Sequence, residues 1–491
     1  MPQGITIVGL GPGAPGLLTV EAQQFLSRVG EVYVRTQEHP TVASLPPQAT
    51  IHSFDLVYEQ AATFAQVYTE IAARITELGH REQGVVYAVP GHPLIGEASV
   101  QRILALAKEQ GLKVRIIEGL SFIEPLCSRL EQDPLNGWQI ADATTLAQCH
   151  YAEFNPDLPL LVGQLYSQEV ASDVKLALMT VYPDDHPVTL VRAAGTADES
   201  LTTIPLYELD RSADIDHLTS LFVPPLSTPG SLAALQEVVS HLRAPEGCPW
   251  DREQTHQSLR PFLLEETHEV LEALDNDDPM SLREELGDLL LQIMLHTQVA
   301  IEDGEFRMAD VVANIVAKLK RRHPHVFGQV QVSGTQEVLV NWERIKTQEK
   351  AAQNQSQGNN DHARGVLSGV PITLPALARA QALRFRAARI GFDWPTSEGA
   401  RAKVQEEWQE LQAASDRSAQ ESELGDLLFA LAVLAGWLDL DAEGALRAAN
   451  ARFEQRFQAM EREAASHGQI LAELKPAQLL ALWEQVRKQN S

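Results

Sequence analysis

The chain has 491 residues and a mass of 54.0 kDa, a length that predicts two to four domains. It carries 39 Lys and Arg residues against 66 Asp and Glu residues, which gives a formal net charge of -27. A chain this acidic repels phosphate backbones and anionic lipids, which argues against a nucleic-acid partner and against a membrane-surface role.

The cysteines and the apolar runs predict a cytoplasmic protein. Cys127, Cys149 and Cys248 form no CxxC pair, which excludes a disulfide framework and fits a reducing compartment. The N-terminus lacks the charged and apolar regions of a signal peptide. The longest apolar run, residues 427–438, is shorter than the roughly 18 residues of a membrane span, so we expect no membrane segment.

The first 210 residues alternate between β-branched runs and helical stretches, which predicts an α/β domain. The segment at residues 223–230 is rich in Pro and Ser and is expected to be a linker, so the first domain is predicted at residues 1–215. Strands are predicted at residues 5–8, 31–34, 84–89, 112–117, 160–162, 175–179 and 188–191, and helices at 19–28 and 96–109.

A glycine-rich loop, Gly9-Leu-Gly11-Pro-Gly13, follows the first predicted strand. Phosphate-binding loops have this position, but Pro12 interrupts the dinucleotide fingerprint and no acidic residue follows the next strand. A tight turn between strand and helix is the alternative for this loop taken alone.

From Ser231 onward, long helical periods replace the strand-like runs. The polar stretch that begins at Gln353 predicts a second, flexible linker, so two helical domains are expected at residues 231–351 and 366–491. Four features recur in both domains in the same order, at offsets of 141, 138, 134 and 141 residues, which indicates an internal duplication. The pairs are Glu266/Glu269 with Glu407/Glu410, Glu285/Asp288 with Glu423/Asp426, Lys318/Arg322 with Arg452/Arg456, and Trp342 with Trp483.

Each repeat carries an ExxE motif on one predicted helix and an ExxD motif on the next. Residues three apart share a helix face, so two such helices packed antiparallel bring four carboxylates together. Such oxygens suit Mg²⁺, with Mn²⁺ as an alternative, and paired ions can bind a polyphosphate and activate water. A solvated helix face is the alternative for one motif alone. However, Glu285 and Asp288 lie on a helix apolar enough to be buried, and Gly287 and Gly425 recur inside these helices, as if a group approaches the backbone there.

Basic and aromatic residues follow the carboxylates in each repeat. Lys318 and Arg322, like Arg452 and Arg456, are spaced i and i+4, so each pair can face one phosphate group. Ordinary surface charge is the alternative for either pair. Trp483 stands where a base could stack, although helix packing explains it as well.

These motifs resemble the MazG family of nucleoside triphosphate pyrophosphohydrolases. The resemblance implies all-α bundles completed by dimerisation, with magnesium-dependent hydrolysis of a nucleoside triphosphate to the monophosphate and pyrophosphate. It is carried by residues 247–251, 264–269, 285–288, 321–327 and 391–394.

Carried over by position, the resemblance implies a metal site in each repeat. Glu406 or Glu407 would polarise the water, with Lys403 on the same helix as a further catalytic group. The implied ligands are Glu266, Glu269, Glu285 and Asp288 in the first repeat, and Glu407, Glu410, Glu423 and Asp426 in the second.

The same resemblance implies nucleotide contacts in the second repeat. Lys403, Arg452 and Arg456 would hold the phosphates, and Trp483 would lie beside the nucleotide. Phe262 occupies the position of Lys403 in the first repeat and carries no charge. We therefore expect the second site to carry most of the turnover.

The N-terminal half resembles the tetrapyrrole methylase family over residues 1–210. The resemblance is carried by residues 9–13 with Leu18-Thr19, 90–93 and 119–121, and it implies two α/β subdomains with S-adenosylmethionine in the cleft between them. Many members have Asp where this chain has His92. The expected cofactor-binding residues are Gly9, Gly11, Gly13, Pro90, Gly91, His92 and Ser121.

The leading hypothesis is a magnesium-dependent nucleoside triphosphate pyrophosphohydrolase that removes surplus or non-canonical nucleotides. The chain contains no GxxxxGK[ST] phosphate loop. Expected partners are nucleoside triphosphates and a second copy of the chain. Two alternatives stay open: a methyltransferase whose helical half serves dimerisation, and a non-enzymatic helical dimerisation module.

Overall fold

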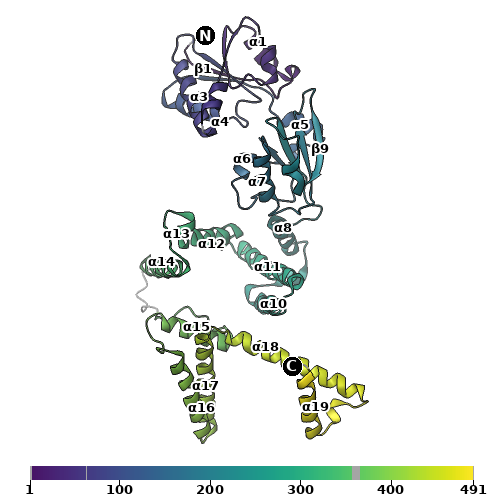
Figure 1. Cartoon of the computed structure of the whole chain (residues 1–491), viewed down its shortest axis with the longest axis vertical. Helices are drawn as coiled ribbons and strands as arrows, with labels where there is room; N and C mark the ends of the chain where they lie inside the picture. The colour runs from purple at the N-terminus through teal and green to yellow at the C-terminus, as the bar shows by residue number, and fades with distance from the viewer. Residues whose placement is uncertain (1–2, 62, 357–364, 490–491) are drawn as a thin grey trace. The chain divides into compact units, whose positions relative to one another are not determined.

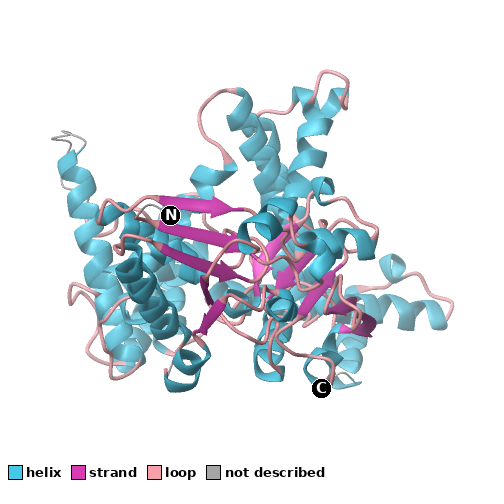
Figure 2. Ribbon diagram, turned by 90° about the horizontal axis from the view of Figure 1, so that it is seen from above, coloured by secondary structure: helices cyan, strands magenta, loops and turns pink. Residues whose placement is uncertain are grey.

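The computed structural model describes residues 3–61, 63–356 and 365–489, and its elements follow the chain from purple to yellow in Figure 1. Within these residues every strand precedes Ser231, and the later elements are helices. Figure 2 draws the strands in magenta and the helices in cyan. The expected order, an α/β region followed by an all-helical region, is confirmed. The chain divides into two compact units, residues 1–258 with 293–299, and residues 259–292 with 300–491.

A five-stranded parallel sheet begins the first unit, with strand order β3-β2-β4-β1-β5. Parallel strands that are covered on both faces bury nearly all their side chains, and all five residues of β4 are buried. Ile7 and Val8, adjacent on β1, belong to two different apolar clusters, because successive side chains point to opposite faces. The strands are β1 (Ile5–Gly9), β2 (Glu31–Val34), β3 (Thr50–Ser53), β4 (Val85–Val89) and β5 (Val114–Ile117).

Four helices connect these strands: α1 (Val20–Leu26), α2 (Asp55–Gln60), α3 (Phe64–Gly79) and α4 (Ala98–Glu109). The predicted helix at 19–28 is confirmed, and the Thr19 side chain caps it by accepting from Ala22 N. Because all five strands run in the same direction, the loops after β1, β2 and β4 meet at one edge of the sheet. Ligands bind at this edge in open α/β sheets.

A second, mixed sheet follows, with strand order β6-β7-β10-β8-β9. β6 and β7 are parallel, and the other pairs are antiparallel. The first domain was predicted to end at residue 215, but β10 begins at Thr219 and lies in the middle of this sheet. The strands are β6 (Gln139–Asp142), β7 (Leu160–Gly163), β8 (Pro187–Arg192), β9 (Ser200–Pro205) and β10 (Thr219–Val223), and the helices are α5 (Ile123–Leu130), α6 (Ala143–Leu146) and α7 (Gln168–Leu178).

The strand predicted at residues 175–179 is wrong, because most of this segment is the end of α7. Ser167 caps α7 by accepting from Val170 N, and the buried residues Ala171, Val174 and Leu178 recur at helical spacing. The strand-like alternation of the last residues is therefore overridden by a helix that begins seven residues earlier.

The segment expected as the first linker follows a defined path against the first unit. Leu226 N donates to Pro156 O at 2.8 Å, and Gly230 N donates to the Asp157 carboxylate at 2.7 Å. The same carboxylate accepts from the backbone N–H and the hydroxyl of Ser231. Ser231 in turn caps α8 (Leu232–Arg243).

Long helices make up most of the helical region, and a short turn joins the two that carry the first pair of carboxylate motifs. Asp278 accepts from Met280 N and Ser281 N, so it caps the helix that begins at Pro279 and forms the short turn between two long helices. The helices are α9 (Pro249–Glu253), α10 (His256–Asp275), α11 (Pro279–Glu302), α12 (Met308–Arg322), α13 (Pro324–Phe327), α14 (Thr335–Ser356), α15 (Ala376–Ala388), α16 (Ser397–Ala413), α17 (Arg417–Trp437), α18 (Ala442–Ser466) and α19 (Pro476–Gln489).

Two sequence-based expectations need correction here. The residues of the second expected linker from Gln353 to Ser356 are helical, as the end of α14, while 357–364 lie outside the described residues. The helix that carries Glu285 is less buried than its composition predicts, since Leu286 is 49% exposed. Apart from the adjacent residues and the helix's own backbone, no atom of the described chain lies within 4 Å of a Cβ placed on Gly287 or Gly425, so no other element approaches these glycines.

Among the described residues, no helix combines the length and the apolar character that crossing a membrane requires.

Candidate functional site

Two carboxylate clusters lie on paired helices of the second unit. In the first cluster, Glu266 on α10 meets Glu285 and Asp288 on α11, with one oxygen of each within 4.8 Å of the others. The second cluster joins three further carboxylates at the same separation, Glu407 and Glu410 of α16 and Glu423 of α17. The helices α16 and α17 pack side by side (Figure 1).

The clusters contain most of the expected ligands. Glu269 is hydrogen-bonded to Glu266, so it lies at the edge of the first cluster. Asp426 is not among the residues that meet within 4.8 Å in the second cluster. The i, i+3 spacing therefore brings both ExxE glutamates and Glu423 together, and leaves the aspartate of the second ExxD motif outside.

The carboxylates of each cluster disfavour one another's charged forms. Partial desolvation, the hydrogen bond to Glu269 and the charge of Asp288 raise the pKa of Glu266. Partial loss of solvent, followed by the charges of Glu269 and Asp288, raises the pKa of Glu285. For Glu410, loss of solvent and then the charge of Glu407 raise the pKa.

A divalent cation would relieve this repulsion, and the donor set fits one. Magnesium binds oxygen at about 2.0–2.1 Å, so its oxygen ligands lie at most about 4 Å apart. Oxygens already within 4.8 Å of one another need only a small contraction to meet that geometry. Glu266, Glu285 and Asp288 could hold such an ion in the first cluster, and Glu407, Glu410 and Glu423 in the second.

Lys403 distinguishes the second cluster from the first. Its ammonium group lies 2.7 Å from Glu407 and 2.9 Å from Glu406, so it already contacts the carboxylates. The hydrogen bonds to Glu407 and then to Glu406 raise the pKa of Lys403. Glu407 is buried, at 5% exposed, whereas the Glu406 side chain is 55% exposed. Phe262 offers no charge at the matching position of the first repeat.

In the first repeat, Arg322 of the basic pair already has a partner in this chain. Arg322 donates to Glu349 at 2.6 Å and lies over the Trp342 ring at 5.3 Å, while Lys318 is half-buried on the same helix. Both residues lie on α12, and Arg322 forms an ion pair in the absence of a ligand.

In the second repeat, Arg452 and Arg456 lie on α18, which packs against α15, α17 and α19. Trp483 packs on Phe453 of α18, with ring centroids 5.2 Å apart. Across the described ranges of the chain, no ion pair joins Arg452 or Arg456 to the second cluster.

In the first unit, the three segments that resemble tetrapyrrole methylases meet in space. Gly91 N donates to Gly11 O at 2.8 Å. A Cβ on Gly9 would lie 2.6 Å from Gly91 O and 2.7 Å from Gly119 N, so backbone crowding alone requires glycine at that position.

A cavity of about 1530 Å³ opens beside this junction, and Pro90 and Gly91 are the two expected cofactor residues among those that line it. His92 and Ser121 make local bonds instead. The ring Nδ1 of His92 accepts from Leu94 N at 3.1 Å, and the Ser121 hydroxyl donates to Glu124 at 2.6 Å. The glycines Gly11 and Gly13 shape the loop with positive φ angles of 71° and 134°.

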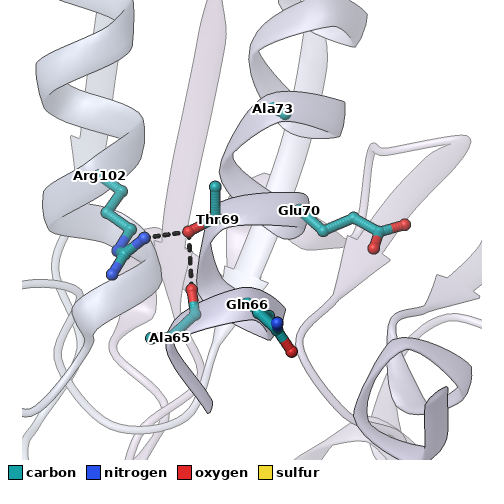
Figure 3. A pocket seen from close by; sticks show the side chains of 6 residues that line it. All are labelled: Ala65, Gln66, Thr69, Glu70, Ala73 and Arg102. Atoms are coloured by element: carbon teal, nitrogen blue, oxygen red, sulfur yellow. Dashed lines mark hydrogen bonds between the residues drawn. The ribbon is translucent and has the colours of Figure 1, made fainter. Parts of the chain in front are cut away.

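Sequence reasoning missed two further residues of this cavity, Arg35 and Glu97, whose side chains form an ion pair at 2.6 Å. The sequence signal that could have revealed Arg35 is a charged residue directly after the strand β2. A shallower hollow lies between α3 and α4, where Arg102 donates to Thr69 and Thr69 donates to Ala65 O (Figure 3).

Comparisons with known proteins match both halves of the chain. The family profile of the MazG nucleotide pyrophosphohydrolase domain matches residues 254–327, and that of the tetrapyrrole (corrin/porphyrin) methylases matches residues 4–210. The uncharacterized protein YabN of Bacillus subtilis (strain 168) is 39% identical over 99% of this chain and 98% of its own length.

Two further matches cover one half each. A nucleoside triphosphate pyrophosphohydrolase of Escherichia coli (strain K12) is 43% identical over 52% of this chain and 97% of its own length. Among solved structures, uroporphyrin-III-C-methyltransferase from Thermus thermophilus has 18% identity and a TM-score of 0.35, over 45% of this chain and 92% of its own.

The carboxylate clusters predict a measurable response to metal. In metal-free buffer, Glu285→Gln is expected to unfold at the same or a higher temperature than the wild type, because it removes repulsion from the first cluster. It should lose the magnesium binding of that cluster, measured by isothermal titration calorimetry. An ion at 100 times its Kd stabilises a fold by about 2.7 kcal/mol, so the thermal shift with magnesium should also shrink. The control Glu284→Gln changes a neighbour on α11 that lies outside the cluster and should bind magnesium as the wild type does. Equal magnesium binding by both variants would show that Glu285 is not a ligand.

Proposed function

Because the chain belongs to the family that joins an N-terminal tetrapyrrole methylase domain to a MazG nucleoside triphosphate pyrophosphohydrolase region, we propose that it hydrolyses nucleoside triphosphates to monophosphates and pyrophosphate. The observation that carries this proposal is the convergence of three carboxylates in each helical repeat. The substrates that we propose are surplus or non-canonical nucleotides, removed to protect the nucleotide pool.

Each carboxylate in the second repeat has a role that its surroundings support. Magnesium or manganese, when bound by Glu407, Glu410 and Glu423, would neutralise polyphosphate charge and make a bound water more acidic. The buried Glu407 suits ligation, since its charge needs a permanent partner. The exposed Glu406, hydrogen-bonded to Lys403, suits acceptance of a proton from the attacking water.

Lys403 supplies a positive charge beside these carboxylates. With no metal bound, the ammonium group of Lys403 compensates the charge of Glu407. With metal and substrate bound, the Lys403 side chain is free to reach across one helical turn toward a phosphate oxygen. Arg452 and Arg456, together with Lys318 and Arg322 of the first repeat, are proposed phosphate contacts. Trp483 is a proposed neighbour of the nucleotide.

The exposed apolar face of α17 supports a homodimer. Leu424, Leu428 and Leu431 are 47%, 45% and 43% exposed and recur at helical spacing on one face. We expect sedimentation equilibrium of the full chain to give twice the mass of 54.0 kDa. Leu428→Glu should shift the mass toward the monomer, because a charge in an apolar interface loses its hydration. A monomeric wild type at the concentrations of the activity assay would contradict the dimer.

A second candidate function, methyl transfer from S-adenosylmethionine, is favoured by one observation. The cavity of the first unit lies where the loops of a parallel sheet meet, and Pro90 and Gly91 line it. Methyl transfer from a sulfonium chiefly requires proximity and alignment, so this cavity could support it without a dedicated acid or base.

The product of hydrolysis distinguishes this reaction from that of an ordinary triphosphatase. The full chain, incubated with magnesium and a panel of nucleoside triphosphates, should release no orthophosphate until inorganic pyrophosphatase is added. Each mole of substrate should then give two moles of orthophosphate, since the cleaved bond lies between the α and β phosphates. Orthophosphate release by the chain alone, with nucleoside diphosphate as the other product, would refute the proposal.

The two repeats are expected to differ in activity. Glu410→Gln should lower kcat/KM by roughly tenfold or more, since a metal ion contributes several kcal/mol of charge stabilisation and 1.36 kcal/mol is a factor of ten. Glu269→Gln makes the same change at the matching position of the first repeat and should retain most activity. Circular dichroism of both variants serves as the folding control. A larger loss in a folded Glu269→Gln protein would show that the Lys403-containing repeat is not the main site.

A further inference from the structure

The large cavity of the first unit contains features that hydrolysis of a nucleotide in the helical region does not use. Its walls come from the loops after β2 and β4 and from elements of the second sheet. Gln164 directly follows β7 of the second sheet and donates to Gly96 O at 2.9 Å. This hydrogen bond connects the two walls next to Glu97. Ligand pockets usually measure about 300–1,000 Å³, so a cavity of about 1530 Å³ has room for more than one small ligand.

The floor of this cavity holds a buried ion pair with unused hydrogen-bonding atoms. Glu97 is 5% exposed, and its Oε1 accepts from Arg35. Within the described part of the chain, Glu97 Oε2 and Arg35 Nε have no hydrogen-bond partner, and neither has the hydroxyl of Tyr58. All three residues line the cavity. Buried polar atoms in folded proteins are nearly always paired, so these atoms point to a bound polar group.

Aromatic rings stand beside the same carboxylate. Tyr58, Phe64 and Tyr68 line the cavity, and their ring centroids lie 6.2 to 6.5 Å from one another. Tyr166 reaches Phe64 from the other wall, with centroids 5.5 Å apart. Aromatic faces combined with a carboxylate form the environment in which proteins recognise ammonium groups.

The charge of the cavity favours the same kind of ligand. Eight carboxylates line it against two guanidinium groups. Arg35 is paired with Glu97, and Arg102 is held against α3 by its bond to Thr69 (Figure 3). Burial and then the charge of Arg35 lower the pKa of His39 to about 4, so its imidazole adds no positive charge at neutral pH. Such a cavity attracts cations and repels polycarboxylates.

We propose that this cavity binds an organic ammonium ligand, which donates an N–H to Glu97 Oε2 and places its carbon atoms against Tyr58, Phe64 and Tyr68. The ligand is a molecule other than S-adenosylmethionine, and a polycarboxylated tetrapyrrole is excluded by charge. The proposal concerns the first unit and stands independently of the hydrolase activity.

Titration calorimetry of the full chain with spermidine as the probe tests this site. Excess magnesium in the buffer occupies the carboxylate clusters of the helical region, and S-adenosylhomocysteine at saturation occupies any cofactor site. Spermidine should bind under these conditions, while neutral triethylene glycol and uroporphyrin should not. Loss of spermidine binding on addition of S-adenosylhomocysteine would assign the ammonium site to the cofactor and overturn the proposal, as would binding of uroporphyrin.

Variants of the full chain test whether spermidine binds beside Glu97. Glu97→Gln should weaken spermidine binding by about tenfold or more, because it removes a charge-assisted hydrogen bond from a buried site. Glu82→Gln makes the same change at an exposed position outside the cavity and should bind as the wild type. The double variant Glu59→Gln/Asp173→Asn changes exposed lining residues and leaves the buried pair intact, so its fold is not at risk. It should weaken binding and flatten its salt dependence. Unchanged affinity in both Glu97→Gln and the double variant would overturn the proposal.

Discussion

Negative charges held close together are the constraint on which both halves of the molecule depend. In the helical region, helix pairs hold three carboxylates within 4.8 Å of one another, an arrangement that becomes favourable only with a cation or a proton between them. Lys403 provides one cation for the second repeat, and Arg35 does so for Glu97 in the first unit.

The carboxylate clusters could be predicted because their geometry is local. Residues three apart share a helix face wherever a helix forms, and Asp278 marks the turn between the two helices of the first repeat. Asp426 has the same spacing but lies outside its cluster, because its distance from the other carboxylates depends on how α16 packs against α17. Periodicity in a short window misassigned residues 175–179, since the helix there is specified by Ser167 and by buried residues further upstream.

Features that depend on distant parts of the chain could not be predicted. Arg35 and Glu97 are 62 residues apart and meet because β2 and β4 are neighbours in the sheet. β10 pairs with β7 and β8, and its position in the middle of the second sheet cannot be read from the residues around Thr219. The order of the strands in the sheets determines these contacts, whereas composition and motif spacing were enough to predict the helical repeats.

The joint between the second sheet and α8 has a mechanical consequence. One carboxylate, that of Asp157, accepts hydrogen bonds from two successive backbone amides and from the hydroxyl of Ser231, which also caps the helix. These three hydrogen bonds to one side chain attach the start of α8 to the loop before β7. The start of α8 is therefore positioned by the loop that precedes β7, so a substitution of Asp157 would affect the placement of the helix as well as the loop.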